Sequence, residues 1–234
     1  MQFLIFVLLI CLFVFLYCIY LLANDDFVFL RRDLTMERLF NIIFLGSLSS
    51  LFFARLFYGL FHTNNILFNP FVFLLFPYFP GLSLLGGALG IGISFLFLAN
   101  NKKNQLPLER LSDFSSVAFL ISLPIGILGF FMLSEDGFSV IKAGSLAVTY
   151  LILFVLFLRF LLPKLLNGIL KEGTITLIFL ICFSIINLIS HISANFNFKN
   201  YLFNLENIIL FLIFLVSLVL LTIQEKLLEK IKKR

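Results

Sequence analysis

The chain has 234 residues, of which 62% are hydrophobic and 12% are charged, and its formal net charge is +5. Soluble domains carry about 25% charged residues, so this composition excludes an ordinary soluble protein and indicates an integral membrane protein. The three cysteines lie in apolar stretches without zinc or redox spacing, and we expect no metal and no cofactor.

Seven stretches are long and apolar enough to cross a bilayer as helices, which requires about 17–25 residues each. They are residues 3–22, 40–61, 82–98, 114–133, 144–162, 175–192 and 208–223. The chain begins without the positive segment of a signal peptide, so we interpret the first stretch as a retained helix. The expected fold is an all-α integral membrane protein with seven transmembrane helices in a single domain, residues 1–234.

Basic residues predict the orientation of this domain. Of the 17 Lys and Arg residues, all except Arg55, Lys142 and Lys199 fall on one side of the seven-helix topology. Cytoplasmic loops are enriched in Lys and Arg, so the N-terminus is expected outside and the C-terminus in the cytoplasm. The positive charge is then a topology signal that suits anionic lipid, and it does not indicate nucleic acid binding.

Polar residues near two predicted helix starts are candidate caps. Thr35 precedes the second span and suits the role of N-cap. Ser112 or Asp113 is expected to cap the fourth span at Phe114.

Arg55 lies inside the apolar second span, where an arginine costs about 2.5–3.5 kcal/mol on insertion scales and therefore needs a partner or a function. Tyr58 follows at a spacing that shares its helix face, and His62 stands at the helix exit. A guanidinium suits a lipid phosphate, so Arg55 and Tyr58 are candidate headgroup ligands and His62 a candidate catalytic residue. Alternatively, Arg55 bonds backbone carbonyls and only holds the helices together.

Residues 62–80 differ from the neighbouring spans because they carry no charge and hold three prolines among aromatic residues. A regular helix cannot continue through those prolines. We expect an arm along the outer membrane interface.

Glycines crowd the start of the third span, and Gly86 and Gly90 form a G-x-x-x-G pair. This pattern is typical of close helix packing. A glycine floor under a lipid headgroup is the other interpretation, which makes Gly86 and Gly87 candidate binding residues. Both interpretations are open at this point.

The sixth span carries Ser184, Asn187, His191 and Asn195 on one helical face. Histidine accepts and releases protons near neutral pH, so His191 is a candidate general base, with Asn187 a candidate headgroup ligand. A hydrogen-bonded structural histidine is the alternative.

Several motifs, taken in order, carry a resemblance to a known family. The chain reads L-T-M-E-R-L-F, A-R-L-F-Y-G-L-F-H, G-L-S-L-L-G-G-A-L-G, R-L-S-D-F and G-I-L-G-F-F-M-L-S-E-D-G. This order resembles the bacterial phosphatidylglycerol–prolipoprotein diacylglyceryl transferases over about residues 34–137. The resemblance implies seven membrane helices with the N-terminus outside, in the bacterial inner (plasma) membrane. It also implies transfer of a diacylglyceryl group from phosphatidylglycerol to the lipobox cysteine thiol of a prolipoprotein, without a metal.

The resemblance also shows departures from the family pattern. Arg55 and Tyr58 match the A-R-L-x-Y motif of that family. Its histidine before the paired glycines is Leu85 here, its fourth-helix arginine is Ile127, and the neighbouring asparagine is Phe130.

Two functions therefore compete. In the first, the protein is a divergent transferase in which Arg55, His62 and His191 take over phosphate binding and proton transfer. In the second, it is a non-catalytic relative that binds lipid or a lipoprotein partner. A channel or transporter ranks last, because no span carries paired charges.

Overall fold

The computed structural model describes residues 2–24, 26–31, 35–61, 81–100, 107–133, 140–194 and 204–225, and their regular elements are all helices. The predicted interfacial arm, residues 62–80, lies outside these ranges together with His62. Nothing in the described residues therefore tests either prediction.

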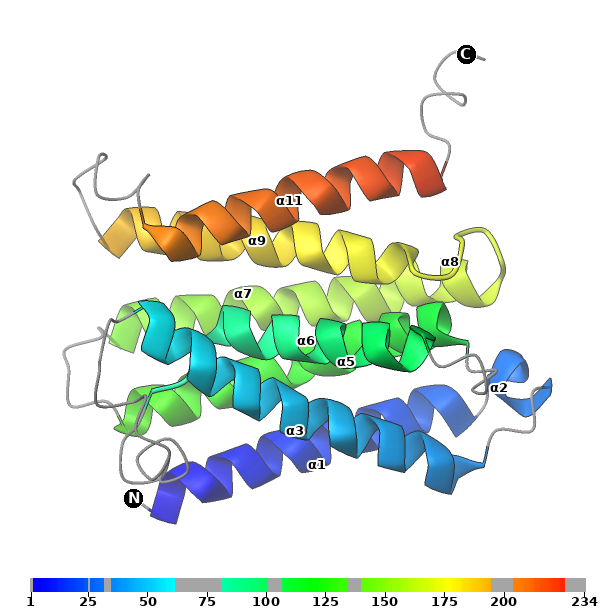
Figure 1. Ribbon diagram of the computed structural model, residues 1–234, viewed down its shortest axis with the longest axis horizontal. Coiled ribbons are helices and arrows are strands. Elements are labelled where there is room, and N and C mark those ends of the chain that lie inside the picture. The colour runs from blue at the N-terminus through cyan, green and yellow to red at the C-terminus, as the bar shows by residue number, and fades with distance from the viewer. Residues whose placement is uncertain are drawn as a thin grey trace. The chain divides into compact units, whose positions relative to one another are not determined.

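Each predicted span coincides with a helix, as Figure 1 shows. The long helices are α1 (Gln2–Asn24), α3 (Met36–Phe61), α5 (Leu84–Asn100), α6 (Leu108–Leu133), α7 (Val140–Leu156), α9 (Thr174–Ala194) and α11 (Leu205–Gln224). Short α2 (Phe27–Arg31) follows α1, and α7 continues through the π-helical turn η2 (Phe157–Leu161) into α8 (Leu162–Leu166).

Six of these helical segments are long and apolar enough to cross a membrane. They belong to α1, α3, α6, α9, α11 and the continuous stretch Ala143–Leu166. The apolar part of α5, Leu84–Phe97, is shorter. The all-α membrane class is thus confirmed, with six candidate spans and one shorter apolar helix among the described residues.

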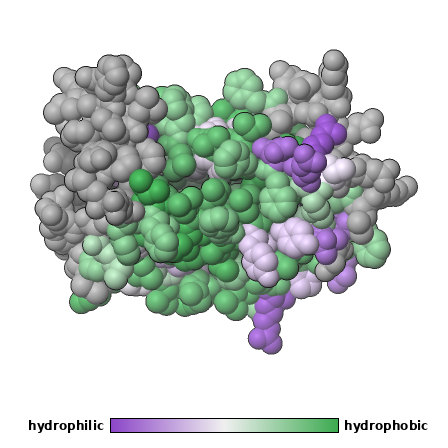
Figure 2. Space-filling model, turned by 90° about the horizontal axis from the view of Figure 1, so that it is seen from below, coloured by the Kyte–Doolittle hydropathy of each residue, from purple (hydrophilic) through white to green (hydrophobic). Residues whose placement is uncertain are grey.

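Large apolar side chains point outward along these helices, which is the opposite of a soluble bundle. On α1, Phe6, Phe13 and Tyr17 are among the exposed residues, with Phe13 68% exposed. The coloured surface seen in Figure 2 is mostly hydrophobic. Hydrocarbon solvates such a surface, whereas water does not.

Packing divides the chain into two compact units. The first, unit 1, consists of residues 1–108 and 118–151, and the second, unit 2, of residues 109–117 and 152–234. Unit 1 therefore holds α1, α2, α3, α5 and most of α6 and α7. Unit 2 holds the first turns of α6 together with α8, α9 and α11.

Within unit 1, α3 and α5 pack closely through glycines. A Cβ atom added at Gly86 would lie 2.6 Å from the carbonyl oxygen of Phe53, and one at Gly90 would lie 2.8 Å from that of Ser49. Ser49 also donates a 3.0 Å hydrogen bond to the Gly90 carbonyl, and Ser50 a 2.9 Å bond to the Gly87 carbonyl. The G-x-x-x-G pair thus allows the two backbones to approach.

The two predicted caps have different outcomes. The Arg38 amide donates to the Thr35 hydroxyl at 3.4 Å, directly before α3, so the Thr35 cap is confirmed. The cap predicted at Ser112 or Asp113 is wrong, because α6 already begins at Leu108 after Pro107. A proline suits a helix start, and the polar first turn extends this helix beyond its apolar stretch.

Candidate functional site

Arg55 and Tyr58 meet at one residue, Gly81, which lies just before α5. Arg55 is only 3% exposed, and its Nη1 donates a 2.9 Å hydrogen bond to the Gly81 carbonyl. The Tyr58 ring lies on Gly81 so closely that an added Cβ atom would be 2.1 Å from its Cε1. The predicted pair therefore shares one face of α3, and we call Arg55, Tyr58 and Gly81 the arginine site.

Ser83 holds the start of α5 against α3 beside this site. The Ser83 amide donates to the Ala54 carbonyl at 3.0 Å, and its hydroxyl accepts from the Gly86 amide at 3.2 Å. The serine thus caps α5 and ties it to the residue that precedes Arg55. This arrangement fixes the carbonyl to which Arg55 donates.

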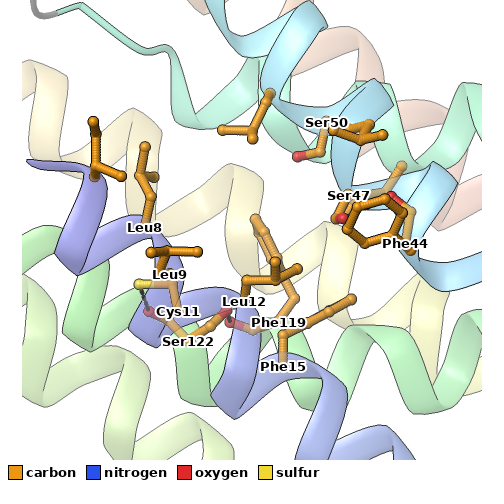
Figure 3. A pocket seen from close by; sticks show the side chains of 14 residues that line it. Leu8, Leu9, Cys11, Leu12, Phe15, Phe44, Ser47, Ser50, Phe119 and Ser122 are labelled. Atoms are coloured by element: carbon orange, nitrogen blue, oxygen red, sulfur yellow. Dashed lines mark hydrogen bonds between the residues drawn. The ribbon is translucent and has the colours of Figure 1, made fainter. Parts of the chain in front are cut away.

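An apolar groove of about 270 Å³ lies between α1, α3, α5 and α6 within unit 1 (Figure 3). Leu8, Leu12 and Phe15 of α1 line it together with Phe44 and other residues of α3. Its few polar groups are satisfied locally. They are Ser47 on the Phe44 carbonyl, Ser50 on the Gly87 carbonyl, Ser122 on the Phe119 carbonyl and Cys11 on the Ser122 carbonyl. The groove walls therefore suit a hydrocarbon chain.

The groove and the arginine site share one face of α3. Phe44, Leu48 and Leu51 line the groove, and Arg55 continues the same series at spacings of four, three and four residues. Each residue advances the helix by about 1.5 Å, so Leu51 and Arg55 are about 6 Å apart along the axis. A charged group and an apolar channel thus follow each other along this face.

Two positions where the resemblance implies polar residues are hydrocarbon here. Leu85 is 2% exposed at the start of α5, next to Gly86, and Ile127 is half-buried on α6. Neither side chain offers a hydrogen bond. The Phe130 side chain lies outside the described residues.

The predicted polar face of α9 lies in unit 2, and its members have different partners. Ser184 and Asn187 donate to carbonyls of their own helix, those of Leu180 and Phe183, each at 2.8 Å. His191 instead reaches α11, where its Nδ1 lies 2.7 Å from Oδ1 of Asn207. Asn195 lies outside the described residues.

Sequence reasoning missed Asn207, which is 5% exposed in the first turn of α11. Its position in the sequence could have indicated this role, because Asn207 carries an amide at the start of the apolar helix that follows α9. Figure 1 shows α9 and α11 side by side. Consecutive helices that pack in opposite directions bring the end of one beside the start of the next.

Two buried carboxylates hold the turn before α9, also within unit 2. Asp113, which is 0% exposed, accepts from the amides of Gly173 and Thr176 at 2.7 and 2.8 Å and from the Thr176 hydroxyl at 2.9 Å. The side chain predicted to cap α6 thus caps α9 instead.

Glu225 acts on the other side of the same turn. It accepts from the Lys171 amide at 3.0 Å and from the Thr174 hydroxyl at 2.8 Å. We call Asp113, Glu225 and the turn between Lys171 and Thr176 the carboxylate clasp. Among the described residues, no three His, Cys, Asp or Glu side chains lie close enough to hold a metal ion.

These features define a multi-pass helical membrane protein that holds a buried arginine beside an apolar groove. Residues 3–138 match the sequence profile of the family described as prolipoprotein diacylglyceryl transferase. The match covers more than half of the chain, so the chain belongs to this family. Comparison with curated proteins and with solved structures found no match. The matched range includes the arginine site, whereas His191 and Asn207 lie beyond it.

Proposed function

We propose that this protein binds an anionic phospholipid such as phosphatidylglycerol at Arg55 and transfers its diacylglyceryl group to the lipobox cysteine thiol of a prolipoprotein. The observation that carries the proposal is the arginine site, which lies within the family match and beside an apolar groove. In this proposal the protein crosses the bacterial inner membrane seven times, with its N-terminus outside.

The charge of Arg55 supports an anionic ligand. The only acid on α3 is Glu37 in its first turn, about 27 Å away along the helix, and α5 carries none. Hydrogen bonds between charged partners contribute about 1.5–3 kcal/mol each, and a guanidinium presents its donors in a fork that fits phosphate. A lipid phosphate therefore suits Arg55 in both charge and donor geometry.

The groove would receive an acyl chain of the same lipid. Its position along the Arg55 face matches the order of a phospholipid, with the phosphate at one end and the chain beyond it. A chain already lies in hydrocarbon, so moving it into the groove adds little hydrophobic free energy. The groove would instead orient the lipid, so that the reacting carbon lies in a fixed position for attack.

The chemistry requires one bond exchange and one proton transfer. A bond forms between the cysteine sulfur and the glycerol carbon of the lipid, while the bond from that carbon to the phosphate oxygen breaks. The thiol proton passes to a base, and the glycerol phosphate leaves with the bonding electron pair. Arg55 would stabilise the negative charge that develops on this phosphate.

His191 is the proposed proton acceptor, with Asn187 as a headgroup ligand in unit 2. His62 remains a second candidate acceptor. The direct headgroup contact predicted for Gly86 and Gly87 also stays a prediction, and the close packing of α3 on α5 already accounts for Gly86.

A non-catalytic lipid-binding relative is the second candidate function. It is favoured by Leu85 and Ile127, which are hydrocarbon where the family carries histidine and arginine. Such a protein would keep the arginine site and the groove without making a product.

Complementation distinguishes the two functions. We expect expression of this protein in a transferase-depleted bacterium to restore lipid-modified lipoprotein, seen as a shift of labelled lipoprotein on a gel. Arg55→Ala should abolish the shift, because the phosphate loses its counter-charge, whereas Ser217→Ala, in the interior of α11, should not. Phosphatidylglycerol binding without product would support the non-catalytic relative. If a folded, membrane-inserted protein shows no phosphatidylglycerol binding and makes no product, both candidate functions are overturned.

A further inference from the structure

We propose that His191 and Asn207 form a proton-accepting pair, in which Asn207 fixes the tautomer of His191 so that Nε2 receives the thiol proton. The assignment of a thiol as the proton donor rests on the proposed transferase function. The geometry of the pair stands on the contacts within unit 2 alone.

The pair has a defined hydrogen-bond direction. Nδ1 of His191 lies 2.7 Å from Oδ1 of Asn207, which is a short and direct contact. An amide oxygen can only accept, so the ring nitrogen that faces it must donate. A neutral imidazole has one donor nitrogen and one acceptor nitrogen. With the proton on Nδ1, the lone pair of the ring is on Nε2, the nitrogen that points away from Asn207.

The surroundings hold Asn207 in place for this role. It is 5% exposed and lies in the first turn of α11, which packs along α9. Asn204 caps this turn, because its side chain accepts from the Glu206 amide at 3.3 Å and its carbonyl accepts from the Ile208 amide at 3.1 Å. A capped, packed first turn fixes the Asn207 backbone, so its amide keeps one direction relative to His191. His191 itself is half-buried, which leaves part of its ring accessible.

An amide suits this task better than a carboxylate. A base in an active site needs a third group that orients it. A carboxylate would also stabilise the protonated ring and favour a resting imidazolium, which cannot accept a proton. Asparagine supplies the orientation without adding that charge. Asn207 is therefore a positioning residue that acts through His191.

Nitrogen-15 NMR of the histidine rings tests the pair directly. The chain has two histidines, so His62→Gln leaves a single ring signal in histidine-labelled protein reconstituted in lipid nanodiscs. At mildly alkaline pH we expect Nδ1 to be the protonated nitrogen and Nε2 to be the bare one. A histidine without such a partner favours the opposite tautomer in water, so the expected result is distinctive. A protonated Nε2 with a bare Nδ1 would overturn the proposal, and this measurement needs no change at Asn207.

Variants at Asn207 separate orientation from packing. Asn207→Ala should shift the ring toward the Nε2-protonated tautomer, whereas Asn207→Asp should keep a proton on Nδ1 because it keeps an accepting oxygen. Ser217→Ala is the matched control on α11, since Ser217 bonds only carbonyls of its own helix in the contacts described, and it should leave the tautomer unchanged. An unchanged tautomer in Asn207→Ala would refute the orienting role.

Transfer assays on the Asn207 variants distinguish a failure of this proposal from a failure of the proposed transferase function. We expect Asn207→Ala to lower the transfer rate by at least about tenfold with unchanged lipid binding, because a general base contributes on the order of 100-fold or more. Lipidated product from Asn207→Ala at the wild-type rate would overturn the catalytic part of the pair. Absence of product from the wild-type protein, with the Nδ1 tautomer present, would instead contradict the transferase function and leave a structural pair.

Discussion

At the scale of single residues, Gly81 determines how the arginine site is built. Its carbonyl receives the Arg55 guanidinium, and its missing side chain leaves the space that the Tyr58 ring fills. The two residues predicted from helical spacing thus depend on a third residue on another segment. Hydropathy and spacing along α3 predict the pair, but they contain no information about which backbone lies opposite.

Gly81→Ala should therefore disturb the site more than its small size suggests. The new Cβ atom would lie 2.1 Å from Cε1 of Tyr58, so the ring must move. Overpacking of this kind costs about 1–3 kcal/mol, which thermal unfolding in detergent would measure as a lower midpoint. Gly144→Ala is the control, because nothing lies within 4 Å of its added Cβ atom. Equal midpoints for the two variants would show that the ring does not depend on Gly81.

At the scale of helices, the sequence predicts positions well and partners poorly. Apolar length locates the seven helices, because a helix in hydrocarbon must satisfy its own backbone groups. It locates the start of α6 less well, since the polar turn at Glu109 and Arg110 is helical without being apolar. The sequence also predicts Asp113 as a cap of α6, whereas its carboxylate caps α9. A carboxylate near a helix start suggests a cap, but only the packing of α6 against the turn before α9 shows which amides it accepts from.

The carboxylate clasp makes a prediction at this scale. Asp113→Asn should lower the free energy of unfolding by about 1–3 kcal/mol, because the amide nitrogen replaces one of the two carboxylate oxygens and cannot accept from the backbone amide, at Gly173 or at Thr176, that this oxygen served. Hydrogen exchange should rise first at the amides of residues 173–176. Ser184→Ala is the control on α9, since Ser184 donates to a carbonyl of its own helix, and it should leave exchange in this turn unchanged. If exchange in this turn does not change in Asp113→Asn, the clasp does not hold α9.

At the scale of the whole molecule, α5 decides the topology. The six longer candidate spans alone would return the chain to its starting side, whereas a crossing by α5 would place the termini on opposite sides. The 17 residues of α5 extend about 26 Å, slightly less than a hydrocarbon core of about 30 Å. Exposed apolar side chains on the other helices are expected of helices in hydrocarbon, whether or not α5 also crosses the membrane.

Accessibility of the two termini answers this question. With seven spans, a tag at the N-terminus should be labelled by an impermeant reagent in intact spheroplasts, while a fluorescent protein at the C-terminus should fold and emit in the cytoplasm. The basic residues predict this arrangement. Both tags on the same side would mean that α5 does not cross, and the seven-span topology would then be wrong.

The central claim is that Arg55 serves diacylglyceryl transfer, and product analysis with purified protein tests it most directly. Wild-type protein in phosphatidylglycerol nanodiscs is incubated with a lipobox peptide, and the peptide mass is measured. We expect a mass gain of one diacylglyceryl group on the cysteine, with Arg55→Ala giving none although it remains folded. An unmodified peptide with folded wild-type protein that binds phosphatidylglycerol would contradict the claim, as would full modification by Arg55→Ala.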